Sequence, residues 1–183
     1  MLLTSWLKKH GIEAEALTVA GPLTLGIEAG TLPSLHQALP RLGHEVARAR
    51  RYERPLSIAL IATDDPQAPS LVTLMLAALV RESVRDTDIV AYAPSLALCI
   101  VGLPEARQAG ARTAMQRVQA LCLERLMLAV RSGVAEFPSA GWTLEELIKQ
   151  AEVDAMRDAT LPALTAPSTP PLTATPDLVR TDV

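Results

Sequence analysis

Arg85 and Asp88 form a charged pair whose residue types and spacing suit the binding of a small molecule. An arginine can donate two parallel hydrogen bonds to a planar acceptor edge, and a carboxylate can accept from neighbouring N–H groups. Purely structural roles compete with this interpretation. A cation near the end of a helix offsets the helix dipole, and aspartate is common in the turn before a strand. The pair is therefore a candidate binding site, with a structural turn as the alternative.

Other residues that carry chemistry show weaker patterns. His10, His36 and His44 have no cysteine or carboxylate partner at metal-ligand spacing, so we assign them surface or capping roles and predict no metal site. We interpret Asp64 and Asp65 as a turn signal rather than a cation site. The sequence shows neither a nucleophile next to a base nor a glycine loop that cradles phosphate, so we predict no catalytic residue and no cofactor.

Composition narrows the class of partner and the compartment. The net charge of −3 argues against nucleic-acid binding, which needs a basic face. The longest apolar run, Leu71 to Val80, is far shorter than the roughly 20 residues that span a bilayer, and the N-terminus lacks the charge order of a secretory signal. Cys99 and Cys122 lie within apolar runs and are expected to be buried free thiols. We therefore predict a cytoplasmic protein without a membrane span.

Hydrophobic periodicity predicts alternating helices and strands in the middle of the chain. The helices are predicted at Leu35 to Tyr52, at Ser70 to Val84, at Glu105 to about Leu123, and after Thr143. The strands are predicted at Leu56 to Ala62, Ile89 to Tyr92, Leu96 to Leu103 and Leu126 to Val134.

Local signals define several of these boundaries. Pro40 is expected to break the first helix or to start it anew, and Ser70 is a plausible N-cap. Thr143 and Glu146 form a capping box. The element order predicts an α+β fold in which helices pack on one face of a sheet that contains antiparallel strands, as in ferredoxin-like palm folds.

The chain divides into three regions on composition. Residues 1–32 hold a short helix at Ser5 to Leu17 and a glycine-rich apolar stretch, and residues 33–160 form the globular domain. Residues 161–183 are rich in proline and threonine, cannot bury a core, and are predicted to be a disordered tail.

Several segments, taken in order, resemble the GGDEF (diguanylate cyclase) family of bacterial signalling domains. The segment Glu45 to Ser57 resembles the family's first helix and strand, and Arg81 to Ala91 resembles the approach to its signature hairpin. Ser132 to Ala135 and Leu147 to Arg157 resemble the late strand and final helix. The similarity covers roughly residues 33–160 and implies the palm-type GGDEF fold, in which helices flank a central sheet that contains antiparallel strands.

The resemblance also implies that the cyclase site is degenerate. The family's metal-binding carboxylate at the end of the first strand falls on Ala62, and its phosphate-binding lysine falls on Ala159. The guanine-recognition segment before Arg85 is shorter than the family pattern by about nine residues. The signature hairpin falls on residues that lack its glycines and acids, namely Pro94, Ser95, Leu96, Ala97 and Leu98. An active cyclase needs carboxylates for two divalent cations, so we predict no enzyme activity and no GTP turnover with Mg²⁺.

In the family, an Arg-x-x-Asp ahead of the hairpin is the inhibitory site that binds cyclic di-GMP, and Arg85 with Asp88 retains it. The chemistry fits, because a guanidinium can bind O6 and N7 of guanine while a carboxylate accepts from its ring N–H and amino group. Arg117 is a candidate second arginine, with a solvated surface position as the alternative. The resemblance thus implies an inactive cyclic di-GMP receptor that regulates a partner protein. The alternative is a ligand-independent interaction or dimerisation scaffold, which the apolar residues 21–32 favour.

Overall fold

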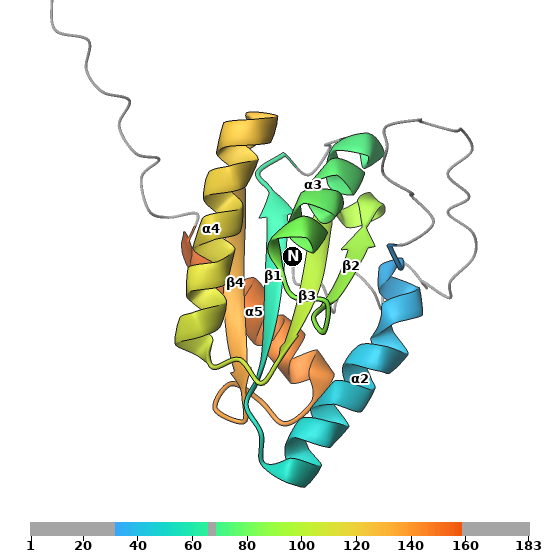
Figure 1. The fold of residues 1–183 in the computed structure, drawn as a ribbon, viewed down its shortest axis with the longest axis vertical. Coiled ribbons are helices and arrows are strands. Elements are labelled where there is room, and N and C mark those ends of the chain that lie inside the picture. The colour runs from blue at the N-terminus through green and yellow to red at the C-terminus, as the bar shows by residue number, and fades with distance from the viewer. Residues whose placement is uncertain (1–31, 66–68, 159–183) are drawn as a thin grey trace, which may run out of the picture.

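A computed structural model describes residues 32–65 and 69–158 of the chain (Figure 1). The predicted N-terminal helix, the proline-rich tail and Ala159 lie outside the described residues, so the domain boundaries stay predictions. The elements run in the order α2 (Leu35–Tyr52), β1 (Leu56–Thr63), α3 (Ser70–Ser83), β2 (Ile89–Ala93), the short 3₁₀ helix η2 (Pro94–Leu96), β3 (Leu98–Pro104), α4 (Gln108–Leu126), β4 (Val130–Phe137) and α5 (Leu144–Asp158).

The sheet has four strands in the order β2-β3-β1-β4, and every neighbouring pair is antiparallel. This arrangement confirms the predicted α+β fold with an antiparallel sheet. β1 lies inside the sheet and all its residues are buried. Ala62 pairs with Leu98 and Leu56 pairs with Pro104, so the β2–β3 hairpin turn lies beside the end of β1.

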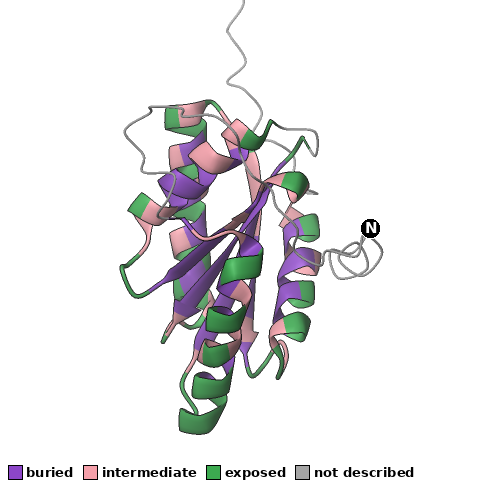
Figure 2. Ribbon diagram, turned by 90° about the vertical axis from the view of Figure 1, so that its right-hand side faces the viewer, coloured by how far each residue is buried: buried purple, intermediate pink, exposed green. Residues whose placement is uncertain are grey.

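Helices cover both faces of the sheet (Figures 1 and 2), which confirms the flanked sheet of the GGDEF fold, whereas the single covered face expected from the element order was wrong. α2 and α5 pack on the face that carries Ile58 and Leu60, whereas α3 and α4 pack on the face that carries Ala59 and Ile61. Successive side chains of a strand point to opposite faces, and a strand with a continuous apolar run is buried on both. The run in β1 therefore requires two covering layers.

α2 is one continuous helix, so the expected break at Pro40 is wrong. Ser34 and Gln37 form a capping box, in which the Gln37 N–H donates to Ser34 Oγ at 3.4 Å and the Ser34 N–H donates to Gln37 Oε1 at 2.9 Å. Buried Leu42 and Val46 hold the following turns against the sheet. Packing of this apolar stripe offsets the single backbone hydrogen bond that an exposed proline removes.

Other boundaries shift by a few residues. Ser70 is the first helical residue of α3 rather than its N-cap, which is Pro69. β3 extends through Pro104, so α4 starts later than expected, and α4 continues to Leu126, so β4 starts at Val130. The capping box at α5 is confirmed, because the Glu146 N–H donates to Thr143 Oγ1 and the Thr143 N–H donates to Glu146 Oε2, both at 3.2 Å.

Candidate functional site

The Arg-x-x-Asp segment forms the turn between α3 and β2. Asp88 Oδ2 accepts a hydrogen bond from the Arg85 N–H at 2.8 Å, and the Asp88 N–H donates to the Arg85 carbonyl at 3.0 Å. Asp88 is only 4% exposed. A short side chain that binds the backbone three residues away fixes a turn. One carboxylate oxygen of the candidate pair is therefore already engaged within the protein.

Arg81 braces the same turn from the last part of α3. Its Nη1 donates to the Asp88 carbonyl at 2.8 Å, and its Nη2 donates to the Arg85 carbonyl at 2.5 Å. Nη2 also lies 3.4 Å from Asp86 Oδ1. No functional role was predicted for Arg81. The signal was present, since an arginine in the last turn of a helix commonly binds nearby carbonyl groups.

Arg117 reaches this region from α4. Its Nη2 donates to the carbonyl of Ser83, the last residue of α3, at 2.8 Å. The structure thus brings the predicted second arginine to the same helix end, with its guanidinium on the backbone. The Arg85 side chain is exposed, and within residues 32–65 and 69–158 it has no hydrogen bond or ion pair. The turn therefore offers one uncommitted guanidinium on a braced backbone.

The hairpin turn at the other end of the sheet is apolar and closed. After η2, Ala97 adopts a left-handed conformation with φ 51°, and its N–H donates to the Pro94 carbonyl at 3.2 Å. The Ala97 carbonyl accepts from the Thr63 N–H at 3.1 Å. Ala97 and Leu98 are buried, and Ser95 is the exposed residue of this turn. The turn folds back onto the end of β1.

The end of β1 carries Ala62 and Thr63, and the exposed Asp64 and Asp65 follow it. The Ala62 side chain has no donor atom, and the Thr63 hydroxyl donates to the Asp65 carbonyl at 2.7 Å. Hard cations need several oxygen ligands around one point. In the described part of the chain, no group of three His, Cys, Asp or Glu side chains is placed to hold a metal ion.

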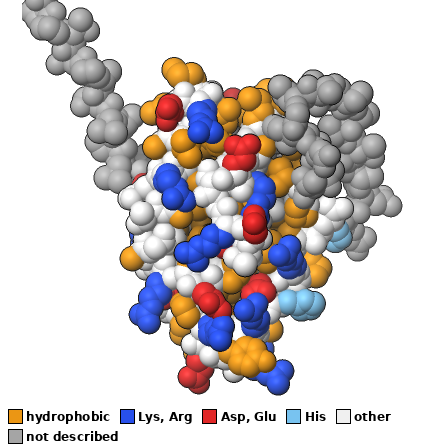
Figure 3. Space-filling view, in the orientation of Figure 1, with side chains coloured by type: hydrophobic (Ala, Val, Ile, Leu, Met, Phe, Trp, Pro, Cys, Tyr) orange, Lys and Arg blue, Asp and Glu red, His pale blue; other side chains and the backbone are white. Residues whose placement is uncertain are grey.

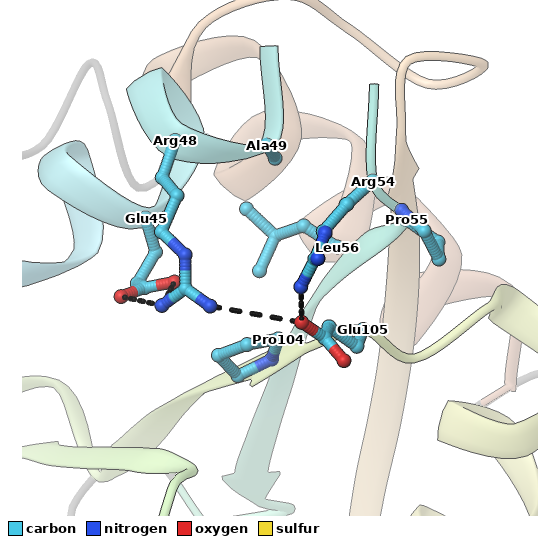
Figure 4. Close-up of a pocket in the computed structure, with 8 residues that line it drawn as sticks. All are labelled: Glu45, Arg48, Ala49, Arg54, Pro55, Leu56, Pro104 and Glu105. Carbon is cyan, nitrogen blue, oxygen red and sulfur yellow. Dashed lines mark hydrogen bonds and ion pairs between the residues drawn. The ribbon is translucent and has the colours of Figure 1, made fainter. Parts of the chain in front are cut away.

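A small recess lies at the opposite end of β1 from the hairpin turn, and Figure 4 shows its lining. Arg48 lies 3.3 Å from Glu45 and 3.6 Å from Glu105, and Arg54 pairs with the same Glu105 carboxylate. The pair of Arg48 with Glu105 joins α2 to the segment after β3. Two arginines and two glutamates balance in charge and are partly exposed, so the recess offers no net charge to a ligand.

The remaining candidates behave as structural residues. Burial raises the pKa of the Cys99 thiol well above its ordinary value and raises that of Cys122 to about 11. Both thiols are free and buried, as predicted. His36 and His44 lie on the exposed side of α2, and His10 lies outside the described residues. No helix among the described residues has the length and hydrophobicity needed to cross a membrane.

The chain is similar to known proteins in its fold but not in its sequence. No protein-family model matches the chain, and no curated protein matches it by sequence. Among solved structures, the GGDEF domain of YfiN (TpbB) from Pseudomonas aeruginosa is similar with a TM-score of 0.62 and 21% identity, over 69% of this chain and 89% of that one. The GGDEF domain of DgcB from Caulobacter crescentus, solved with cyclic di-GMP, has a TM-score of 0.60 and 13% identity, over 70% and 85%.

A third similar structure is the diguanylate cyclase SiaD from Pseudomonas aeruginosa, solved with its activator SiaC. Its TM-score is 0.62 with 16% identity, over 85% of this chain and 64% of that one. Together these similarities show that the chain contains a GGDEF-like domain by fold. The family resemblance drawn from the sequence is thereby confirmed at the level of fold.

Proposed function

We propose that this GGDEF-like domain is a catalytically inactive receptor for cyclic di-GMP that uses no cofactor, acts in the cytoplasm and regulates a partner protein. The observation that carries the proposal is the exposed guanidinium of Arg85, which has no partner among the described residues, on a turn that Arg81 and Asp88 hold in place. A rigidly mounted guanidinium loses less freedom on binding and can donate two hydrogen bonds to the O6 and N7 edge of guanine.

In this proposal Asp88 both holds the turn and contacts the base, and Arg117 is a positioning residue. The Asp88 carboxylate holds the Arg85 amide, and Arg117 fixes the end of α3 through the Ser83 carbonyl. Arg85 is then the residue that recognises the base, while the second oxygen of Asp88 is the acceptor for the guanine N–H groups. In this proposal both residues still contact cyclic di-GMP, and the Asp88 carboxylate also stabilises the turn, a role that the sequence alone does not reveal.

The inactive state is supported by the residues at the end of β1 and in the hairpin. Phosphoryl transfer from GTP needs charge neutralisation around the triphosphate, which carboxylate-bound cations supply. Ala62 and the turn of Pro94 to Leu98 carry no carboxylate, and the nearest ones along the chain are the exposed Asp64 and Asp65 after β1. The similar structures of DgcB with cyclic di-GMP and of SiaD with its activator support the class of ligand and the presence of a protein partner.

Calorimetric titration of the full chain with cyclic di-GMP, beside GTP, tests the proposal. We expect cyclic di-GMP binding that Arg85→Ala weakens by about tenfold or more, because loss of a bidentate guanine contact costs about 1–3 kcal/mol. The matched control is Arg50→Ala, an exposed arginine on α2, which should leave the affinity unchanged. Absence of binding heat, or equal affinity in both variants, would refute the receptor. Turnover of GTP with Mg²⁺ would refute the inactive state.

One observation favours a second function, that of a ligand-independent scaffold or homodimer. Asp88 closes its turn through the Arg85 amide and so has a structural role that needs no ligand. In that case the Arg-x-x-Asp segment only stabilises the fold and binds no ligand. Sedimentation measurements separate the two, because a scaffold associates to the same extent with and without cyclic di-GMP and in the Arg85→Ala variant.

A further inference from the structure

α3 differs from the other helices in the character of its outer side. From Leu71 to Val80 it contains no charged residue, and its single polar residue there, Thr73, is fully buried. The side that faces the sheet is defined by four residues with no exposed surface, namely Thr73, Leu76, Ala77 and Val80. At 3.6 residues per turn, Leu71, Met75 and Ala78 lie on the opposite side, with Leu74 beside them. Leu71 and Met75 are half-buried, Leu74 is half-buried and packs against the core, and Ala78 is 8% exposed. We call Leu71, Leu74, Met75 and Ala78 the α3 stripe.

The outer sides of the other helices carry charged residues, as expected for helices at the surface of a protein, together with single exposed hydrophobic residues such as Leu123 and Met156. Exposed charged residues lie along α2, α4 and α5, among them Arg41, Arg112, Glu124, Glu145 and Lys149. Figure 3 shows charged side chains across the middle of the α3/α4 face, whereas hydrophobic side chains gather at its upper end. A helix that is apolar on all sides is normally covered on all sides. The surface that Leu71 and Met75 leave partly exposed is therefore where a further segment can cover the α3 stripe.

The path of the chain at the edge of the sheet indicates which segment this is. Leu32 is only 7% exposed and packs in the core on the α3/α4 face, whereas Leu35 packs on the α2/α5 face. Between them, the Pro33 carbonyl accepts a hydrogen bond from the Tyr92 N–H at 3.3 Å. The chain therefore passes around the edge strand β2. Leu32, the first described residue, therefore lies on the α3 side of the sheet.

The composition and length of the preceding segment suit the stripe. Residues 20–31 include Leu23, Leu25 and Ile27 and contain a single charged residue, Glu28. The stripe is about 10 Å long, since a helix rises by about 1.5 Å per residue. Four extended residues span about 13 Å, so the segment is long enough to run along it.

We propose that residues 20–31 bind in cis to the α3 stripe and bury it. Leu23, Leu25 and Ile27 supply the apolar contacts, and the short tether at Leu32 gives the segment a high effective concentration at the stripe. The contact goes beyond the cyclic di-GMP site and does not depend on it. A protein partner with an apolar segment gains access to the stripe only by displacing these residues.

Thiol labelling of the full chain tests the contact. Met75→Cys places a reactive thiol on the stripe, while native Cys99 and Cys122 are fully buried and stay silent. Adding Leu23→Asp, Leu25→Asp and Ile27→Asp should speed labelling at position 75 by about tenfold or more, because a covering segment protects the thiol in proportion to its bound fraction. Adding Thr24→Asp alone should leave the rate unchanged, as should the triple change for a thiol at Gln116→Cys on the exposed side of α4.

The alternative occupants give different results. A labelling rate at position 75 that is the same with and without the three aspartates would overturn the proposal. A rate that rises on dilution of the protein would show that a second copy covers the stripe, which also overturns the cis contact. Protection that is independent of protein concentration and lost in the triple variant is the expected outcome.

Discussion

At the scale of single residues, Gly133 in β4 shows how closely α5 approaches the sheet. A Cβ at this position would lie 2.0 Å from the Ala151 carbonyl oxygen and 2.3 Å from the Ala155 nitrogen. Both are backbone atoms, so the whole helix must move to make room. We expect Gly133→Ala to lower the free energy of unfolding by about 2–3 kcal/mol, measured by urea denaturation. Gly110→Ala, in α4 where nothing lies within 4 Å, is the control and should stabilise the protein slightly.

Glu146 gives a residue-scale prediction about pH. Hydrogen bonds from the backbone N–H groups of Trp142 and Thr143 hold the pKa of Glu146 below its ordinary value of 4.5. A group with a lowered pKa in the folded state contributes stability above its unfolded pKa and loses it as the pH falls through the folded pKa. We expect Glu146→Gln to flatten this acid-side loss in unfolding measurements from pH 7 to pH 3. Glu145→Gln, in the same helical turn, should leave the profile unchanged; an identical effect of both changes would contradict the assignment.

The same scale shows what sequence reasoning can find at the site. The types and spacing of Arg85 and Asp88 located the turn correctly, because the two residues are only three positions apart in the chain and their geometry is local. Arg117 contacts the Ser83 carbonyl, 34 positions away, and Arg112 contacts Asp154, 42 positions away. Both contacts depend on how the helices pack. The engagement of the Asp88 carboxylate with a backbone N–H is likewise a result of folding that residue identity alone does not reveal.

At the scale of elements, α2 shows where a local rule fails. The strong helix-breaking tendency of proline predicts a break at Pro40, yet the helix continues through it. We expect Pro40→Ala to raise the free energy of unfolding by about 1 kcal/mol or more, because it restores the backbone hydrogen bond to His36 at an exposed site. Chemical denaturation measures this gain. Gln37→Ala, which removes the capping-box side chain from the same helix, should act in the opposite direction; a loss of stability in Pro40→Ala would show that the proline ring itself packs favourably.

The sequence predicted the four strands correctly but not the two covered faces of the sheet or the start of β4. The apolar runs and the breaks between them give all four strands, since period and composition are properties of the local sequence. The error about the covered faces came from the assumption of one layer of helices, although the all-apolar run of β1 already indicated burial on both sides. The start of β4 was misplaced because Leu126 and Leu128 are apolar residues in and after the end of α4, and their pattern resembles a strand.

At the scale of the whole molecule, the two edge strands of the sheet, β2 and β4, are covered by different kinds of contact. The Pro33 carbonyl contacts the β2 edge at Tyr92. Along the β4 edge, side chains of α5 bind the outward N–H groups, with Asp154 Oδ2 2.8 Å from the Val134 nitrogen and Asp158 Oδ2 3.3 Å from the Ser132 nitrogen. Unpaired strand edges promote association with other chains, and charged side chains at an edge prevent it.

The β4 edge therefore yields a prediction about the behaviour of the molecule in solution. Asp154→Leu removes both the acceptor for the Val134 N–H and the ion pair with Arg112, and it leaves an apolar side chain beside the edge. We expect a loss of about 1–3 kcal/mol in stability, because the donor becomes unsatisfied, and concentration-dependent association in sedimentation velocity runs. Arg112→Leu removes only the ion pair and should leave the protein monodisperse to the same extent as the unchanged chain. Equal association in the two variants would assign the effect to surface charge and not to the exposed strand, because only Asp154 contacts the edge itself.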